Sequence, residues 1–558
     1  MKYKAAFLTM LFLSLTLNAE KYYIRHLDGK NIVIINENHE IVSYSLKNFL
    51  EEINNGDTLL FKRGEYFKTP VEIKNKKNII IKDYGSQKLP MPIIDPRVKI
   101  PFKNFEEIEL SNQKLLTKDK SLISLKNIFT KNRAVLATHI RNKTVKNITE
   151  VKKHIHKIFR IKIGKNIEKN TLRIWINNQE ILKALIFEEL KCENCKEKIR
   201  WAFENENGYL YIFVLDPSVS LPENSFIKIN AVTLDTISLT NDENITLKNI
   251  DIRGSKYALG IRGSKNILIE NCNIGKYSFT AIDIMRSLEN RRKYSENITV
   301  KNCLIDSGFN KKYRYLSSRG VQDAIFMVDG VKNCNISNNK ITNWGHSGIN
   351  LYAPLFKEEV KNNKISHNTI DGKDISYMHG ITVDGEHCIE NEISSNLIKN
   401  ITARNQLNGI KNIFRKNIVY NVKNSIVKID QGYPCGQGIQ IQAYGKDNLA
   451  LENLIEENVF TKIEGAAISI INYKNDGIKK RNIFKNNFIT KSGLRNKNVA
   501  LEILNFSEIN NIKENFFINN TFKVDFQEPK INYFGKILSI EEFNEEQKNF
   551  IKDNKILY

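Results

Sequence analysis

Beyond its first residues, the sequence lacks any apolar run long enough to cross a membrane as a helix. The single apolar run near the start, Ala5–Leu17, follows the basic residues Lys2 and Lys4 and ends shortly before a small residue, Ala19. A basic head, a short apolar stretch and a small residue before the cut are the parts of a secretory signal peptide. We therefore predict a signal peptide over residues 1–19, cleaved near Ala19. The mature protein is expected to be secreted or periplasmic, with no stable membrane anchor.

Cysteine is sparse, and its spacing provides no zinc site. Cys192 and Cys195 form a CxxC, but no second CxxC follows to complete a set of four ligands. Export favours a local disulfide between these two cysteines. Cys272, Cys303 and Cys334 recur in repeats where other copies carry Ile, which predicts small buried side chains.

Two classes of function are disfavoured by what is missing. No nucleic-acid-binding module is recognisable, so nucleic acid is not expected as a partner. Tracts rich in Met and His, which would suit a protein for metal-enzyme maturation, are also absent. The formal net charge of +23 favours a polyanionic partner. The whole chain is rich in Lys, Asn and Ile, however, so part of this excess is equally typical of a solvated surface.

A phrase of alternating apolar and polar residues returns along the second half of the chain. Its clearest copies are Asn244–Ile252, Asn266–Ile274 and Asn297–Ile305, and the steps between copies run from about 21 to about 41 residues. This alternation predicts strands with one buried face and excludes a solenoid of helices. Later copies keep an Asn near the same place: Asn339, Asn368, Asn396, Asn417, Asn458, Asn487 and Asn515.

The repeated Asn has a physical role in a stack of coils. Equivalent residues of neighbouring coils lie about 4.8 Å apart. An amide both donates and accepts, so each can bond to the next at about 1 kcal/mol net per bond. Each inward Ile adds about 1.5 to 3 kcal/mol when fully buried. One coil is unstable alone but a stack of about ten is stable, so the 558 residues fit a single solenoid.

Short helices are predicted at both ends, where a stack needs cover for its open edges. Ser45 is placed to cap the first helix, and Gly56 ends it. Residues 539–542 read as a capping box that opens the second helix. The side chains expected to face inward are Leu46, Phe49, Leu50 and Ile53 in the first helix and Ile540, Phe543, Phe550 and Ile551 in the second.

The start of the predicted solenoid resembles a known superfamily. Gly56–Tyr66, followed by Tyr84–Gly85 and Pro90, is similar to the opening of secreted β-helix proteins of the pectate-lyase-like superfamily. The Asn-Ile coils resemble the parallel β-helix (PbH1) repeats of that superfamily. The resemblance covers residues 30–95 and 232–525 and implies an all-β fold, a right-handed parallel β-helix solenoid. It leaves the chemistry open, because the superfamily includes lyases, hydrolases, epimerases and proteins without known activity.

Residues 100–230 have a different pattern. Strand-like runs such as Thr171–Asn177 and Gly208–Leu215 alternate without the Asn signature, which predicts an inserted β-rich module beside the helix. This module either extends a binding groove or only stabilises the fold. The predicted organisation is a signal peptide (1–19), an N-terminal cap with the first coils (20–99), the inserted module (100–230), the β-helix repeats (231–525) and a C-terminal cap (526–558).

A second phrase, a small residue before Ile, marks one strand of each coil. Its copies are Leu259–Ile261, Thr280–Ile282, Asp323–Ile325, Ser347–Ile349, His379–Ile381, Gln437–Ile439 and Ala466–Ile468. Segments of variable length flank this strand, and such loops build the walls of a groove, where function tends to lie. If the Ile points inward, the exposed positions are Asp283, Met285, Phe326, Val328, Asn350, Tyr352, Thr382, Asp384, Gln440 and Gln442.

Three titratable residues stand at the turn before this strand in consecutive coils: Asp323, His346 and His379. With about 4.8 Å per coil and about 3.3 Å per residue, their backbones lie roughly 6 Å apart from one coil to the next. An Asp that orients one imidazole while another titrates near neutral pH is an acid–base set. We predict that these three residues are catalytic. A polar ladder without catalysis is the alternative, and a metal bound by the three is a less favoured one.

Carboxyl spacing argues against a glycosidase, which needs two carboxyls about 5 to 9.5 Å apart. Asp384 is two coils from Asp323 and five residues further along the strand, which separates them by roughly 19 Å. Asp283 and Asp384 are three coils apart, roughly 14 Å.

Polygalacturonase motifs are matched only in part. Asp323–Ile325 and Gly345–Gly348 resemble two of them. Gln322 and Thr280 stand where that family is expected to have Asp, and no Arg-Ile-Lys is present. A hydrolase of that type is therefore disfavoured.

Proton abstraction next to a uronate carboxylate fits these residues better. Elimination and epimerisation share this first step, in which a base takes the sugar proton while cations or amide donors hold the carboxylate. We predict an exported, monomeric, carbohydrate-active protein that acts on an anionic polysaccharide as a lyase or C5-epimerase. A non-catalytic glycan-binding β-helix and a glycoside hydrolase stay as alternatives, and a requirement for Ca²⁺ stays open. The predicted substrate-binding residues are Arg286, Arg319, Tyr352, Asp384, Gln440 and Gln442.

Overall fold

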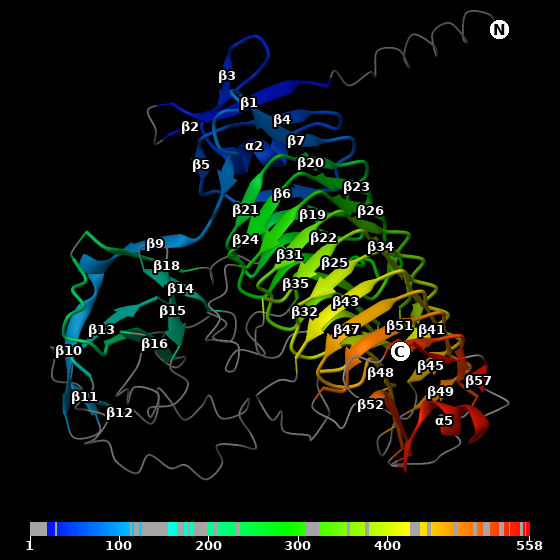
Figure 1. Cartoon of the computed structure of the whole chain (residues 1–558). Coiled ribbons are helices and arrows are strands. Elements are labelled where there is room, and N and C mark those ends of the chain that lie inside the picture. Colours follow the sequence, from blue (N-terminus) through cyan, green and yellow to red (C-terminus); the bar gives the residue numbers. More distant parts are fainter. Residues whose placement is uncertain are drawn as a thin grey trace, which may run out of the picture.

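The chain forms a long stack of short strands (Figure 1). In this computed structural model no helix within the described residues is long and apolar enough to cross a membrane. Residues 1–18 of the predicted signal peptide, the CxxC at Cys192 and Cys195, and Arg319 lie outside the described residues. The structure describes residues 19–27, 31–111, 114–116, 122–124, 155–163, 172–176, 179–183, 198–204, 209–222, 224–229, 235–307, 323–353, 358–373, 379–423, 436–443, 448–472, 477–494, 499–505, 514–523, 529–534, 536–546, 551–552 and 554–557.

Three sheets run along the stack, and each coil adds strands to all three. Sheet I holds the strands whose flanking loops are predicted to form the walls of the groove, and its neighbouring strands are parallel except for the last pair, which is antiparallel. Its thirteen strands are β6 (Val71–Lys74), β19 (Asp235–Thr240), β22 (Tyr257–Arg262), β25 (Thr280–Met285), β28 (Ile325–Val328), β32 (Ser347–Tyr352), β36 (His379–Asp384), β40 (Asn405–Leu407), β44 (Ile439–Ile441), β48 (Ile468–Asn472), β52 (Val499–Asn505), β55 (Lys530–Tyr533) and β56 (Lys536–Leu538).

Sheets II and III form the other two sides. Sheet II has thirteen strands: β5 (Tyr66–Phe67), β8 (Ile93–Ile94), β21 (Asp251–Arg253), β24 (Asn273–Gly275), β27 (Leu304–Asp306), β31 (Lys340–Thr342), β35 (Thr369–Asp371), β39 (Leu397–Lys399), β43 (Ile418–Val422), β47 (Val459–Ile463), β51 (Phe488–Ser492), β54 (Thr521–Lys523) and β58 (Lys555–Leu557). Sheet III has twenty-two: β1 (Lys21–His26), β2 (Ile32–Ile35), β3 (Ile41–Ser43), β4 (Thr58–Lys62), β7 (Ile80–Tyr84), β20 (Thr246–Lys248), β23 (Lys265–Glu270), β26 (Ser295–Lys301), β29 (Val331–Lys332), β30 (Asn335–Ser337), β33 (Val360–Lys361), β34 (Lys364–Ser366), β37 (Cys388–Ile389), β38 (Glu392–Ser394), β41 (Gly409–Ile410), β42 (Ile413–Arg415), β45 (Leu449–Leu451), β46 (Leu454–Glu456), β49 (Ile478–Lys480), β50 (Ile483–Lys485), β53 (Phe516–Ile518) and β57 (Ile551–Lys552).

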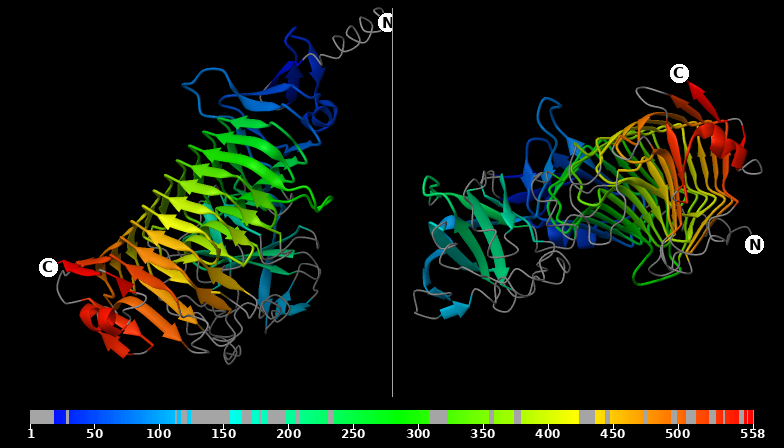
Figure 2. Two further views of the ribbon diagram at one scale, coloured as in Figure 1. Left: turned by 90° about the vertical axis from the view of Figure 1, so that its right-hand side faces the viewer. Right: turned by 60° about the horizontal axis from the view of Figure 1, so that its bottom comes forward.

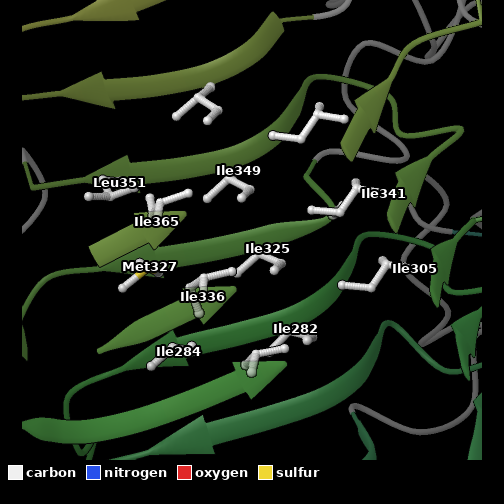
Figure 3. Packing of buried hydrophobic residues seen from close by; sticks show 14 of the residues in the cluster. Ile282, Ile284, Ile305, Ile325, Met327, Ile336, Ile341, Ile349, Leu351 and Ile365 are labelled. Carbon is white, nitrogen blue, oxygen red and sulfur yellow. The ribbon is translucent and has the colours of Figure 1, made fainter. Parts of the chain in front are cut away.

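Columns of aliphatic side chains fill the interior. In sheet I, Ile282, Ile325 and Ile349 form one column, because the register pairs each with the next, and all three are fully buried. Figure 3 shows them packed near Ile305 and Ile341 of sheet II. The alternation predicted from the sequence is therefore confirmed, with apolar residues inside and polar residues on the outer faces.

The repeated Asn does form ladders, but not a single one: buried asparagines form two hydrogen-bonded columns, and Asn244, Asn266 and Asn297 of the first copies form a separate exposed one. Asn368 donates from Nδ2 to Oδ1 of Asn396 at 3.0 Å, and Asn396 donates in the same way to Asn417 at 3.0 Å. The first column is Asn339, Asn368, Asn396, Asn417, Asn458, Asn487, Asn520 and Asn554. The second is Asn363, Asn391, Asn412, Asn453, Asn482 and Asn515. Asn515 was predicted in the first column but belongs to the second.

The three cysteines predicted to be core residues are buried free thiols. The backbone N–H of Cys303 donates to Oδ1 of Asn339 at 2.9 Å. Cys334 donates in the same way to Asn363 at 2.9 Å. Cys303 and Cys334 thus continue the two asparagine columns toward the N-terminus as small apolar side chains.

A short helix lies near each end of the stack (Figure 1). Helix α2 (Leu46–Glu52) begins after Ser45, whose side chain accepts from the backbone N–H of Asn48. Helix α5 (Ile540–Glu546) follows Ser539, which exchanges hydrogen bonds with Glu542 at 2.7 and 3.1 Å. Both predicted helix starts are confirmed. Helix α5 ends at Glu546, so the prediction that Ile551 belongs to it was wrong: Ile551 lies in β57 and pairs with Phe517. Phe550 lies outside the described residues.

The inserted segment forms a separate sheet beside the stack, visible in Figures 1 and 2. Its strands are mostly antiparallel and bury a core of their own that includes Ile174, Phe203 and Ile212. In spatial order the strands are β12 (Leu122–Ser124), β11 (Lys114–Leu116), β10 (Glu106–Ser111), β13 (Lys157–Lys162), β17 (Tyr209–Val214), β16 (Ile199–Glu204), β15 (Gln179–Lys183), β14 (Ile174–Ile176), β18 (Phe226–Ile229) and β9 (Val98–Pro101). Arg173 joins this module to the β-helix, because its guanidinium donates to the backbone oxygens of Tyr277 and Ser307.

Candidate functional site

Side chains on the outer face of sheet I line up across the coils. One column, in coil order, is Asp283, Phe326, Asn350, Thr382, Gln406 and Gln440. Gln406 belongs to β40, a coil that the small-residue-before-Ile phrase does not mark, because Asn405 occupies the place that Ile439 holds in the next coil. Gln440 is therefore two coils from Thr382 instead of one.

Most of this outer face is buried, which corrects the prediction that its positions are exposed. Asp283 and Asn350 are 4% and 5% exposed, Thr382 and Val328 are buried, and Gln440 is fully buried. A side chain that points away from the interior of the coil stays buried when neighbouring side chains of the same outer face pack over it. Among the ten predicted positions, the part-exposed ones are Met285, Phe326, Tyr352 and Asp384.

Asp323 and His346 form a hydrogen-bonded pair at the start of two adjacent sheet I strands. Oδ1 of Asp323 lies 2.9 Å from Nδ1 of His346. The same oxygen accepts the backbone N–H of Ser347 at 2.8 Å, and Oδ2 accepts from Asn350 Nδ2 at 3.2 Å. The Asp323 carboxyl is 4% exposed, whereas the His346 ring is 32% exposed. Asp323 is therefore fixed and buried, and it orients an imidazole that reaches solvent.

Two hydroxyls extend this network to the next coil. Thr382 Oγ1 lies 2.8 Å from Asn350 Oδ1 and 3.1 Å from Ser347 Oγ. Ser347 Oγ in turn lies 3.1 Å from Nδ1 of His346. The positions of Asp323 and His346 are thus set by side chains of β32 and β36, and the network spans three consecutive coils.

The charge state of His346 depends on Asp323. Burial lowers the pKa of His346, but the negative charge and hydrogen bond of Asp323 outweigh it and hold the pKa above its usual value. Asp384 acts in the same direction, and the positive charge of Arg404 acts against it. Because Asp323 occupies Nδ1, the nitrogen that exchanges protons with a ligand is Nε2.

His379 packs against His346 but is chemically different. The two ring centroids are 5.1 Å apart at an interplanar angle of 69°. His379 is buried, and its Nδ1 lies 3.3 Å from the backbone oxygen of Arg404. Burial, followed by the positive charges of Arg404 and His346, puts the pKa of His379 well below its usual value. His379 is therefore neutral at pH 7. In the register it pairs with Ser347, so His346 precedes the predicted column by one residue.

Arg404 is a cation of the site that the sequence patterns did not reveal. It precedes β40 and is buried, and its charge lowers the pKa of His346 and of His379. Its charge also counters the effect of burial on Asp384, whose pKa burial raises. A search for the Ile phrase skips this coil. If one sheet I strand is assigned to every coil, β40 is recognised, and Arg404 then stands just before it.

Two aromatic rings lie next to this group on the outer face. Phe326 and Tyr352 come from adjacent strands, their ring centroids are 5.9 Å apart, and both are part-exposed. Tyr352 pairs in register with Asp384, and burial followed by the charge of Asp384 raises the pKa of Tyr352. Asp384 accepts from Asn408 Nδ2 at 3.1 Å.

The other predicted substrate-binding residues occupy different places. Gln440 and Gln442 are fully buried, and their amide nitrogens and oxygens have no hydrogen-bond partner within the described residues. Arg286 is buried and donates to the backbone oxygen of Ser287 at 3.0 Å. Arg286 follows the end of β25, whereas Asp323 precedes the start of β28, so the structure does not bring Arg286 to the histidines. Arg319 lies outside the described residues.

A second acidic group lies toward the N-terminal end of the same face. Arg262 donates to Asp235 at 2.7 and 3.1 Å and lies 3.5 Å from Asp283. Burial raises the pKa of Asp283 to about 7, against the lowering effect of Arg262. The sequence placed Asp283 on the correct face but gave no sign of this shift, because burial on the outer face was not foreseen.

No group of three or more His, Cys, Asp or Glu side chains within the described ranges is arranged to hold a metal ion. In His346 and His379, one ring nitrogen faces the Asp323 carboxylate or a backbone carbonyl, respectively. The group functions in this structure as a hydrogen-bonded network.

Comparison with known proteins agrees with this architecture. Residues 235–421 match the family described as the right-handed β-helix region. No curated protein sequence matches the chain significantly.

The chain has low similarity to several solved structures. XylC in complex with xylose is 12% identical, covers 92% of this chain and 84% of its own, and has a TM-score of 0.42. The GH136 lacto-N-biosidase from Eubacterium ramulus is 10% identical, with 93% and 70% covered and a TM-score of 0.42. The A-module of the mannuronan C-5 epimerase AlgE6 from Azotobacter vinelandii is 10% identical, with 92% and 93% covered and a TM-score of 0.35. Because these identities and TM-scores are low, the chemistry is inferred from the side chains of this chain alone. By its repeats, its three parallel sheets and its family match, the chain is a right-handed parallel β-helix protein with PbH1-type repeats.

Proposed function

We propose that this protein acts on a uronate-containing polysaccharide by removing the proton next to the sugar carboxylate, as a lyase or a C5-epimerase. The observation that carries the proposal is the Asp323–His346 pair, in which a buried carboxylate orients a part-exposed imidazole. The resemblance to the pectate-lyase-like superfamily supports a sugar polymer as the substrate. The predicted signal peptide supports action outside the cytoplasm.

His346 is the proposed base. Its Nε2 takes the C5 proton, and Asp323 stabilises the imidazolium that forms. Elimination then breaks the C4–O bond, leaves a double bond between C4 and C5, and passes the proton from Nε2 to the leaving oxygen. Epimerisation instead takes a proton from water on the other face of C5, and the imidazolium returns its proton to solvent. His379, neutral and buried behind His346, holds the orientation of that ring and does not supply the proton.

Charge that develops on the sugar carboxylate needs donors. Arg404 is the cation whose field reaches both histidines. Gln440 and Gln442 present buried amides without partners in the described structure, and an unpaired buried amide costs about 1–3 kcal/mol. These amides lie three coils beyond His346 in the register of sheet I, too far to hold the carboxylate of the same sugar, so we assign that carboxylate to Arg404.

The rings of Phe326 and Tyr352 are the proposed stacking surface for a neighbouring sugar. Aromatic rings suit the apolar face of a pyranose, and a phenol adds a hydrogen-bonding tip. Tyr352 and Asp384 also lie at the exposed edge of the face, where hydroxyls of the sugar can reach them.

The test is a panel of polyuronates with two readouts, ultraviolet absorbance of unsaturated ends and NMR of the C5 configuration. The mature protein is expected to change one of them, and His346→Gln is expected to reduce the rate by about 10²–10⁴-fold while binding persists. His367→Asn is the matched control, because His367 is exposed and has a left-handed backbone that Asn tolerates. Binding without any turnover by the unmodified protein would point to a non-catalytic glycan-binding protein.

A glycoside hydrolase is the second candidate, and Asp283 is the observation that favours it. With its pKa raised to about 7, Asp283 holds a proton at neutral pH and suits a general acid toward a glycosidic oxygen. Asp283 and Asp323 come from adjacent sheet I strands, and the charge of Asp323 contributes to the raised pKa of Asp283. Release of reducing ends without unsaturated products, abolished by Asp283→Asn, would favour this candidate.

A further inference from the structure

A cluster of cations lies where the inserted module meets the β-helix. Two carboxylates lie among them, Asp95 and Asp251. The cluster comes from segments far apart in the sequence, since some members belong to the module and others to coils of the β-helix. We call it the cation cluster, and its five members are Arg97, Arg173, Lys228, Arg253 and Lys276. Arg97 and Arg173 lie 4.6 and 4.9 Å from the ring centre of Trp175. Lys228 Nζ lies 3.8 Å from Asp95, Arg253 pairs with Asp251, and Lys276 lies within the field of the three arginines.

Arg97 has an unused donor at the centre of the cluster. Its Nε and Nη2 donate to Asp95 at 2.7 and 2.6 Å, and the guanidinium lies 4.6 Å from the ring centre of Trp175. Its side chain is 1% exposed, and Nη1 has no hydrogen-bond partner within the described residues. A buried charged N–H without an acceptor is costly, so this position suits an anion that completes the guanidinium.

The two lysines of the cluster are destabilised by their neighbours. Burial, countered by Asp95, lowers the pKa of Lys228, and the charges of Arg97 and Lys276 lower it further. Burial also lowers the pKa of Lys276, followed by the charges of Arg97, Arg253 and Arg173. Lys276 is part-buried in a left-handed turn and has no carboxylate partner within the described structure. Positive charge is thus in excess here, and an anion would relieve the repulsion.

The cluster shares an edge of the β-helix with the Asp323–His346 pair. Lys276 directly follows β24 of sheet II, and Asp323 shortly precedes β28 of sheet I in the next coil. One coil is about 4.8 Å, so His346, in the coil after that, is roughly two coil spacings from Lys276 along the stack. Tyr277, which follows Lys276, is buried, and its backbone oxygen accepts a hydrogen bond from Arg173.

We propose that the cation cluster is an anion-binding site that holds an acidic group of the same polyanionic chain whose neighbouring sugar lies at His346. This inference rests on the proposed function, since it assigns the inserted module a part in recognising the substrate. The ligand chemistry is a carboxylate or a sulfate ester on a sugar. Arg97 Nη1, Lys276 and Lys228 provide the donors, and Trp175 closes the site from the module side.

The test measures the binding of polygalacturonate oligomers and of a sulfated neutral polysaccharide by calorimetry. The Lys228→Gln/Lys276→Gln double variant is expected to bind the preferred polyanion at least about tenfold more weakly, with a smaller dependence on salt. Lys82→Gln/Lys364→Gln is the matched control, because it removes the same charge from exposed positions on sheet III. Melting temperatures of both variants verify that each is folded.

Each outcome bears on a different claim. Equal affinity in the double variant and the control would overturn the anion site, even if turnover on uronates is found. Weaker binding by the double variant would support it, even if no polyuronate is turned over and the proposed chemistry fails. Preference for the sulfated polymer over the uronate would identify a sulfate ester as the group that is held. If the unmodified protein bound neither polymer, and inorganic sulfate failed to raise its melting temperature, the inference would be wrong.

Discussion

Replacing Asp323 with Asn tests how the buried carboxylate controls His346. Oδ1 of Asp323 accepts two N–H groups, from His346 and Ser347, so the amide oxygen of Asn would keep this place. The amide nitrogen would then face Nδ2 of Asn350, another donor, at the 3.2 Å now spanned by a hydrogen bond. Asn350 cannot turn over without losing its bond from Thr382. One hydrogen bond is lost and a buried donor is left unpaired, which costs about 1–3 kcal/mol.

We expect the catalytic effect of Asp323→Asn to be larger than its effect on stability. Loss of the carboxylate removes what holds the pKa of His346 above its usual value, so the imidazolium formed in the reaction is less stable. We expect the rate on the preferred polyuronate to fall by about 10²–10⁴-fold. The acid limb of the pH profile is expected to move to lower pH. Steady-state rates between about pH 5 and pH 9 measure both effects, and an unchanged profile with full activity would refute the assignment of His346 as the base.

The same pair gives a pH-dependent stability with a defined sign. A His whose pKa is raised on folding binds more protons in the folded state. Its contribution is fully present below the unfolded pKa of about 6.5 and is lost as pH rises through the folded value. The difference in unfolding free energy between the unmodified protein and Asp323→Asn is therefore expected to shrink as pH rises. Urea unfolding at several pH values measures it, and a difference that grows with pH would contradict the ion pair.

Three further predictions concern the rest of the fold and the site. Because the pKa of Asp283 is raised to about 7 in the folded state, the free energy of unfolding falls as the pH rises from the unfolded pKa of about 4 to pH 7. Asp283→Asn is therefore expected to raise the free energy of unfolding at pH 8 by about 2–4 kcal/mol, with little gain at pH 4. Urea unfolding at both pH values checks this. Asn396→Ala breaks buried hydrogen bonds to both neighbouring coils and is expected to lower the free energy of unfolding by about 2–5 kcal/mol. Asn297→Gly removes one exposed hydrogen bond at a left-handed position and is expected to lower it by less than about 1 kcal/mol. Chemical denaturation compares the two variants. Tyr352→Ala and Phe326→Ala are each expected to raise KM for the polymer by about tenfold, with a smaller change in kcat. A fall in kcat as large as the rise in KM would argue against a stacking role.

The sequence was sufficient for the fold and for the contact between Asp323 and His346. Alternation and the repeated Asn predicted the inward columns and the amide ladders, because both depend on strand geometry and on one residue type at a fixed place. Asp323 and His346 were predicted together because adjacent coils place equivalent turns side by side. Their contact at 2.9 Å agrees with the prediction that these side chains can touch.

What the sequence could not reveal depends on irregular coils and on burial. Arg404 was missed because Asn405 interrupts the Ile phrase of its coil. The low pKa of His379 and the raised pKa of Asp283 both follow from burial on a face that looks exposed in the pattern. The cation cluster was missed because Arg97 and Lys276 are 179 positions apart in the sequence, and no spacing rule joins a module to a coil.

The most direct test of the central claim follows the proton itself. A polyuronate labelled with deuterium at C5 is incubated with the mature protein, and loss of the label to solvent is measured by mass spectrometry. Both elimination and epimerisation through His346 predict release of the label, and His346→Gln is expected to abolish it while His367→Asn releases it at the rate of the unmodified protein. Cleavage of the polymer with the label fully retained would contradict proton abstraction and would place the chemistry with Asp283 as a hydrolase.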